Sequence, residues 1–210
     1  TKFTATQAGE GMEYLALAGW KTNDIISAMP GMLDLAAAGA LDLGRAADIV
    51  SDTMQAFGLD ASTATHAADV FAYAQANANT NVEQMGEAMK YLSPIAHALG
   101  WSLEESSAAT MSLANSGLKG SIAGQAFASS LARLSKPTKR MAGLMKKTGM
   151  EFFDAEGKMK SMPELVAEIE KGTKGMTEQQ RSAALSVLFG AEAYKHWAIL
   201  LDTGSGKLKD

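Results

Sequence analysis

Apolar side chains recur at steps of three and four along much of the chain. Such steps place side chains on one face of an α-helix, so the pattern predicts amphipathic helices that bury an apolar face. Three stripes of this kind are clear: Val82, Met85, Met89, Leu92, Ala96 and Leu99; Ala64, Ala67, Phe71, Ala74 and Ala78; and Ala184, Leu188, Ala191, Tyr194 and Ala198.

Helix start signals accompany the stripes. In a capping box, a Ser or Thr hydroxyl accepts a hydrogen bond from the backbone three residues on, and the acid or amide there reaches back. Four segments fit this pattern. They are Thr80–Glu83, Ser102–Glu105, Ser161–Glu164 and Thr177–Gln180.

A weak internal repeat connects three of the expected helix boundaries. The segments "AGWKTNDIISAM", "FGLDASTATHAA" and "LGWSLEESSAAT" each have a glycine, a large apolar residue, a polar cap and a helical pattern. The glycines are Gly19, Gly58 and Gly100, and each suits the left-handed position that ends a helix. The spacing predicts helical hairpins of about 40 residues. We expect three such units in a compact multi-helix bundle of duplicated hairpins, because a long solenoid needs more copies.

One stretch departs from the helical pattern. In "MEFFDAEGKMKS" an acidic turn ending in Gly157 separates two short apolar segments, which is typical of a small β-hairpin. The expected fold class is therefore all-α with one short β-hairpin near residues 150–161. The expected division is a helical core at 1–149, the hairpin at 150–161, C-terminal helices at 162–201 and a flexible tail at 202–210.

Composition agrees with closely packed helices and narrows the chemistry. Aromatic residues make up only 7% of the chain, and cysteine is absent. The three histidines, His66, His97 and His196, do not have the spacing of a helical zinc motif, so we expect no metal, cofactor or thiolate chemistry.

Charge is distributed unevenly. The chain carries a net charge of −4, yet residues 133–160 hold eight bases and three acids. We interpret this basic stretch as a solvated helix face. No apolar run is long enough to span a membrane, and the start at Thr1 leads us to expect a fragment of a longer protein.

The glycine-rich segment "GLKGSIAGQAF", residues 117–127, raises the question of a phosphate loop. Such a loop needs a strand before the glycines and a lysine followed by Ser or Thr, whereas here Lys119 precedes Gly120 and a helical pattern precedes Gly117. We expect these small residues to serve backbone geometry and close packing. The structural glycines that we single out are Gly19, Gly58, Gly100, Gly117, Gly120 and Gly124.

A second alternative is a lytic site. Lytic transglycosylases carry Glu-Ser, Gly-Leu-Met-Gln and Ala-Tyr-Asn motifs, which Glu105-Ser106, "GLM" at 143–145 and Ala193-Tyr194 partly match. The match breaks at Lys146 and Lys195, and Glu105 is the expected capping partner of Ser102. We therefore expect no catalytic residues.

The order of several segments resembles one known family. The segment "IAHALGWSLEESSAATMSLANSGLKGSIAGQAFASSLARLSKP" resembles the conserved core region of phage tail tape measure proteins. The segments "YLALAGWKTNDIISAMPGMLDLAAAG", "LGRAADIVSDTMQAFGLDA", "AADVFAYAQANANT" and "LFGAEA" follow the family's order.

This resemblance implies a structural protein rather than an enzyme. Family members are long helical chains inside the tail tube. Their length sets the tube length, and they leave ahead of DNA at infection. The implied partners are tail tube subunits, tail assembly chaperones and other copies of the chain, with host membrane contact at ejection and no specific nucleic acid. The implied location is the tube lumen of the virion, and the host cytoplasm during assembly.

Two alternatives stay open at this point. Chains of this family can carry cell-wall lytic domains, so a lytic domain is one. A membrane-active module that forms a channel for DNA is the other, because small residues permit tight helix contacts in lipid. Acids such as Asp34, Asp48, Asp69 and Glu87 argue against insertion.

Overall fold

The computed structural model describes residues 2–206, which fold into ten α-helices and one 3₁₀ turn. The all-α expectation is confirmed. The helices are α1 Ala5–Leu17, α2 Thr22–Gly39, α3 Leu43–Phe57, α4 Ala64–Asn77, α5 Val82–Ala98, α6 Leu103–Asn115, α7 Gly120–Ser135, α8 Lys139–Thr148, α9 Met162–Thr173 and α10 Glu178–Thr203, with the 3₁₀ turn η1 at Ala61–Thr63.

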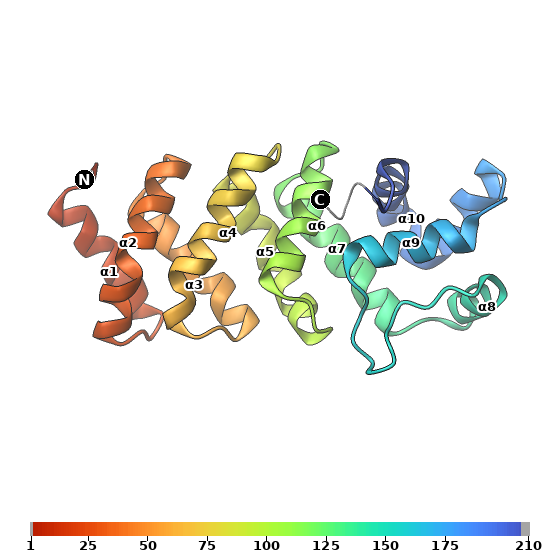
Figure 1. Ribbon diagram of the computed structural model, residues 1–210, viewed down its shortest axis with the longest axis horizontal. Helices are drawn as coiled ribbons and strands as arrows, with labels where there is room; N and C mark the ends of the chain where they lie inside the picture. Colours follow the sequence, from red (N-terminus) through yellow and green to blue (C-terminus); the bar gives the residue numbers. More distant parts are fainter. Residues whose placement is uncertain (1, 207–210) are drawn as a thin grey trace.

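The first seven helices stack in a row along the long axis of the molecule (Figure 1). Helices α1, α3, α5 and α7 pack side by side in one layer, and α2, α4 and α6 pack in a second layer. Each helix from α1 to α5 thus contacts the helix two positions further along the chain. These hairpins form a short stacked array, because each hairpin buries its apolar faces against the next hairpin.

Glycines in the left-handed conformation close three of the hairpins. Gly19, Gly58 and Gly100 have φ values of +85°, +65° and +88° and lie between α1 and α2, α3 and α4, and α5 and α6. Residues with a side chain adopt such φ values poorly, so the glycines permit the tight reversals that place successive helices antiparallel. The proposed division of the whole chain into four segments stays a prediction.

Three of the four expected capping boxes are present. Ser102 with Glu105, Ser161 with Glu164, and Thr177 with Gln180 begin α6, α9 and α10. The fourth expectation, Thr80 with Glu83, is wrong by one residue. Asn81 is the N-cap of α5, and its Oδ1 accepts from the Gln84 backbone at 2.8 Å, because Asn is an even better N-cap than Thr.

The predicted β-hairpin at 150–161 is not found. Among the described residues this segment contains a single antiparallel bridge, between Phe153 and Met159, and no strand. Two backbone hydrogen bonds join the arms, from Lys160 to the Phe152 carbonyl at 3.0 Å and from Asp154 to the Lys158 carbonyl at 2.9 Å. Other polar groups of the segment bond the connection between α5 and α6. The Met159 backbone donates to the Leu99 carbonyl at 3.1 Å, and Trp101 Nε1 donates to the Lys160 carbonyl at 3.0 Å. The Trp101 contact uses the Lys160 carbonyl, which the next bond of a longer ladder would need.

Helix α10 breaks at Gly190, where φ is +84° and ψ is 173°. The break shifts the helical phase, so Ala191 of the third predicted stripe is exposed, and Tyr194 and Ala198 are only partly buried against the core. Leu188 is buried, whereas Ala191 is exposed and Trp197 takes a buried position beyond the break. The helix also runs through Thr203 into the expected tail; residues 207–210 of that tail lie outside the described residues.

Candidate functional site

The glycine-rich segment that the sequence singled out forms the turn between α6 and α7 and the first part of α7. Helices α5 and α7 make the most extensive contact between any two helices of the described chain. A Cβ added at Gly124 would lie 2.8 Å from the Cα and the carbonyl carbon of Ala88, much closer than atoms in ordinary contact. Gly124 therefore lets two helix backbones meet directly.

The other residues of this segment shape the turn. Gly117 and Gly120 have φ values of +87° and +59°. Gly120 begins α7, and a Cβ there would meet only atoms at 4.0 Å, so its left-handed backbone is the feature that favours glycine. Lys119 Nζ donates to Asn79 Oδ1 at 2.6 Å on an exposed surface. The lysine is thus directed to a neighbouring loop, and a helix precedes the turn where a phosphate loop has a strand.

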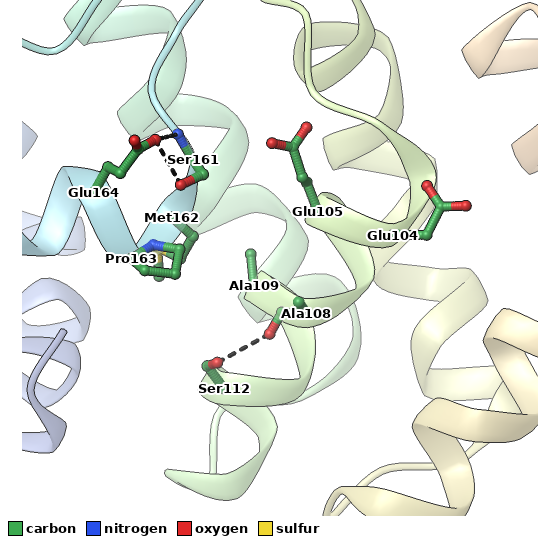
Figure 2. Close-up of a pocket in the computed structure, with 9 residues that line it drawn as sticks. All are labelled: Glu104, Glu105, Ala108, Ala109, Ser112, Ser161, Met162, Pro163 and Glu164. Carbon is green, nitrogen blue, oxygen red and sulfur yellow. Dashed lines mark hydrogen bonds between the residues drawn. The ribbon is translucent and has the colours of Figure 1, made fainter. Parts of the chain in front are cut away.

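A groove of about 470 Å³ lies between α6 and α9 and contains the acid of the lytic alternative (Figure 2). Glu105 Oε2 accepts from the Ser102 backbone at 2.9 Å, and the Glu105 backbone donates to Ser102 Oγ at 3.1 Å. Lys158 Nζ lies 3.6 Å from the same carboxylate. Glu105 is therefore a capping residue that pairs with a lysine.

The remaining acids of the groove have similar roles. Glu164 accepts from the Ser161 backbone at 2.8 Å, which begins α9. Glu104 bonds His66 Nε2 at 2.6 Å, and this bond lowers the pKa of Glu104. A general acid for sugar cleavage needs a raised pKa, whereas the pKa of Glu104 is lowered. The groove offers two helix starts and an apolar floor.

The histidines do not form a metal site. His66 bonds Glu104, the ring of His97 lies edge-on to Phe57, and burial lowers the pKa of His196. Across the described residues, no three of the His, Asp and Glu side chains gather closely enough to hold a metal ion.

The helices also bear on the membrane alternative. Within residues 2–206 no single helix has the length and hydropathy of a membrane span. Among these residues, helices α2 and α3 are the one pair that reaches this length and hydropathy together, and the pair is bent by 114°.

The comparisons with known proteins decide the family. The model of the phage-related minor tail protein family matches residues 1–190. This chain belongs to that family. No solved structure matches it.

Two curated relatives of this tail-protein family member cover its whole length. It is 43% identical over 208 residues to the tape measure protein of Pneumococcus phage Dp-1, an alignment of 99% of this chain and 18% of that protein. It is 28% identical over 213 residues to the probable tape measure protein of Escherichia phage P2, an alignment of 99% of this chain and 26% of that protein. The chain thus spans about a fifth to a quarter of the length of these relatives.

One group of residues that holds α10 to the first seven helices has no clear signal in the local sequence. Arg133 donates from Nε to the Leu188 carbonyl and from Nη2 to the Val187 carbonyl, both at 3.1 Å. Trp197 Nε1 donates to Ser130 Oγ at 2.8 Å. Nothing in the local sequence of Arg133 indicates carbonyl partners more than 50 residues away; the only related signal is Gly190, whose backbone break leaves those carbonyls unpaired.

Proposed function

We propose that this chain is a folded assembly module of a phage tail tape measure protein. In this role it lies in the tail tube, takes part in setting tail length and assembling the tube, and leaves with the rest of the protein during DNA ejection. Its proposed partners are tail tube subunits, assembly chaperones and other copies of itself. The observation that carries the proposal is the 43% identity to a tape measure protein along the whole chain.

The fold supports a module rather than a ruler. A continuous helix rises about 1.5 Å per residue, so 210 residues in one helix would extend about 300 Å. Here no helix exceeds 26 residues in the described chain, and successive helices fold back on one another. A stacked array of hairpins is much shorter than one continuous helix of the same sequence. We therefore infer that it contributes surfaces for assembly and adds little to tail length.

Deleting the codons for residues 1–210 in the phage that encodes them tests the proposal. We expect electron micrographs to show no tails or tails of irregular length, and a plasmid copy of the wild-type gene to restore them. Infectious particles with normal tails would contradict the proposal. Uniform tails shortened by about 300 Å would instead assign the segment to the ruler.

The same phage separates the lytic alternative. If the segment were a cell-wall hydrolase, the deletion would leave tails of normal length that fail at intact cell walls. Glu105→Gln would then reproduce that defect. Under our proposal Glu105→Gln supports wild-type infection, because glutamine retains the hydrogen bond of the capping box.

A further inference from the structure

Glycines inside the helices of this protein mark the places where another residue approaches. At seven of them an added Cβ would come closer than ordinary van der Waals contact to a neighbour. Gly9 and Gly143 are different, because an added Cβ at either would meet nothing within 4 Å. Glycine is unfavourable in a helix interior, and these two have no internal contact to account for it. The seven filled positions are Gly11, Gly31, Gly39, Gly44, Gly86, Gly124 and Gly172.

Gly143 lies in the middle of a cationic face on α8. Positions 139, 140, 146 and 147 surround it at helical spacing, and all four are exposed Lys or Arg residues. No acid occurs between Arg133 and Met150. Within residues 2–206 none of these four cations has an ion-pair partner. The opposite side of α8, with Met141 buried, packs on the core.

Gly9 lies in an exposed apolar stripe on α1. Ala5, Gly9, Met12 and Ala16 follow steps of four, three and four, and all are exposed. The other face of α1, with Gly11 against Leu43, is already occupied by α3.

Acids adjoin this stripe. Glu10 and Glu13 share a cleft of about 390 Å³ with Asp42 and Asp48. Arg45 lies in the cleft, but its guanidinium already bonds Asp48 and two acids of α5. Glu10, Glu13 and Asp42 are left without a cation among the described residues, so the cleft is open to a basic partner.

Helices α1 and α8 lie at opposite ends of the molecule (Figure 1). They therefore cannot contact each other within one copy. We propose that α8 of one copy packs across α1 of the next, with Gly143 near Gly9 and the α8 cations facing Glu10, Glu13 and Asp42. Such a contact joins two different surfaces and is heterologous, so it links copies head to tail in a closed ring or an open chain.

A second copy fits both surfaces better than another anionic partner does. Phosphate in nucleic acid or lipid would satisfy α8 but leave the acidic α1 unmatched. Helix α8 has no aromatic residue for base stacking, and its apolar side faces the core, away from any membrane. The inference names the surfaces for the self-association that the proposed function includes, but it is argued from the two helix faces alone and does not need the assignment to a tail.

Charge reversal at each end tests the contact in the 210-residue chain. Sedimentation velocity should show concentration-dependent association of the wild type at about 0.1 M salt and less at about 1 M, as the Debye length falls from about 10 Å to about 3 Å. Lys146→Glu with Lys147→Glu, or Glu10→Lys with Glu13→Lys, should each weaken it by about tenfold or more. Mixing the two charge-reversed proteins should restore it, because each then offers the complement of the other.

A matched control reverses the same number of positive charges in the middle of the row. Lys90→Glu with Lys119→Glu should leave association unchanged. The glycines provide a test that is independent of charge. Gly143→Leu should raise the dissociation constant by about tenfold or more while the monomer stays folded, because open space surrounds that position.

Three results would overturn the proposal. The first is a wild-type chain that stays monomeric at every concentration and salt. The second is association that the double variants and their mixture do not change. The third is a wild-type chain that binds a DNA duplex or anionic phosphatidylserine vesicles through Lys146 and Lys147 while its self-association ignores the same substitutions.

Discussion

Helix α7 contacts α5 and α10 in different ways. Toward α5 it presents Gly124, and the two backbones meet with no side chain between them. Toward α10 it presents Phe127, Ser130 and Arg133. The Phe127 ring lies edge-on to the Trp197 ring, and Ser130 Oγ accepts from the Trp197 indole nitrogen. Arg133 donates to two carbonyls at the end of a helical segment. The first contact depends on the absence of atoms, and the second depends on polar atoms that must be present.

This difference predicts opposite sensitivities. The α5–α7 contact should tolerate loss of charge and reject any added volume, because close-packed backbones cannot move apart locally. The α7–α10 contact should be sensitive to loss of its donors, because buried carbonyls without a partner are unfavourable. Helix α7 is therefore held to α5 by close backbone packing and to α10 by hydrogen bonds and ring contacts.

The largest expected effect is at Gly124. Gly124→Ala should reduce the free energy of unfolding by about 1–3 kcal/mol and Gly124→Leu by about 3 kcal/mol or more, because the added Cβ would meet the Ala88 backbone. Urea denaturation at a protein concentration where the chain is monomeric provides the measurement.

Gly143→Ala is the matched control for that prediction. It makes the same change inside a helix but in open space, so it should stabilise the chain by up to about 1 kcal/mol through helix propensity. Equal effects at Gly124 and Gly143 would show that propensity, and not close approach, governs both positions.

The second effect is at Arg133. Arg133→Met keeps much of the apolar stem but leaves the Val187 and Leu188 carbonyls without their donors, so we expect a loss of about 2 kcal/mol. Arg181→Met is the control, because it removes an exposed arginine that bonds only Asp202 and should cost less than about 1 kcal/mol. Thermal melts that rank Arg181→Met as the more damaging would contradict the comparison.

Local sequence was sufficient for one side of α7 and insufficient for the other. The small residues near Gly124 and the capping boxes at Ser102, Ser161 and Thr177 are short-range patterns, and short-range physics determines helices and their starts. The partner of Gly124 was beyond reach, because the sequence does not say which helix lies opposite.

The misses have a common cause in long-range contacts. The segment around Phe153 has the pattern of a hairpin, yet its described residues form one bridge only, and its Met159 amide and Lys160 carbonyl bond the connection between α5 and α6. The stripe from Ala184 to Ala198 has one phase in sequence, yet Gly190 breaks it where Arg133 can bind the freed carbonyls. In both places a tertiary hydrogen bond competes with a local preference, and no periodicity reports it.

A third and smaller effect depends on pH and lies outside both contacts of α7, at Glu168 of α9. Burial raises the pKa of Glu168, but hydrogen bonds from Lys160 and the Glu151 backbone lower it more, and the folded-state pKa is below its ordinary value. A lowered carboxyl pKa adds stability above the unfolded value, near pH 4.3, and this stability is lost as the pH falls through the folded value.

Glu168→Gln should therefore cost about 1 kcal/mol at neutral pH and flatten the loss of stability in acid. Glu178→Gln, at an exposed acid of α10, should leave the acid response as in the wild type. Urea melts across the acid range compare the two variants with Gly124→Ala. The Gly124→Ala penalty should stay constant with pH, since that contact contains no titrating group, and a penalty that vanished in acid would refute the backbone explanation.

The smallest effect is expected at Lys119, only five residues from Gly124. Its ammonium donates to Asn79 on an exposed surface, and the contact between α5 and α7 does not involve it. Lys119→Ala should change the free energy of unfolding by less than about 0.5 kcal/mol, as exposed substitutions usually do. Adding inorganic phosphate or ATP should shift the melting temperature of wild type and variant equally, because a specific site would stabilise only the protein that binds. A ligand-dependent rise that Lys119→Ala abolishes would revive the phosphate-loop interpretation. Equal melting temperatures of wild type and Lys119→Ala, together with a destabilised Gly124→Leu, would show that this glycine-rich segment allows two helix backbones to pack directly.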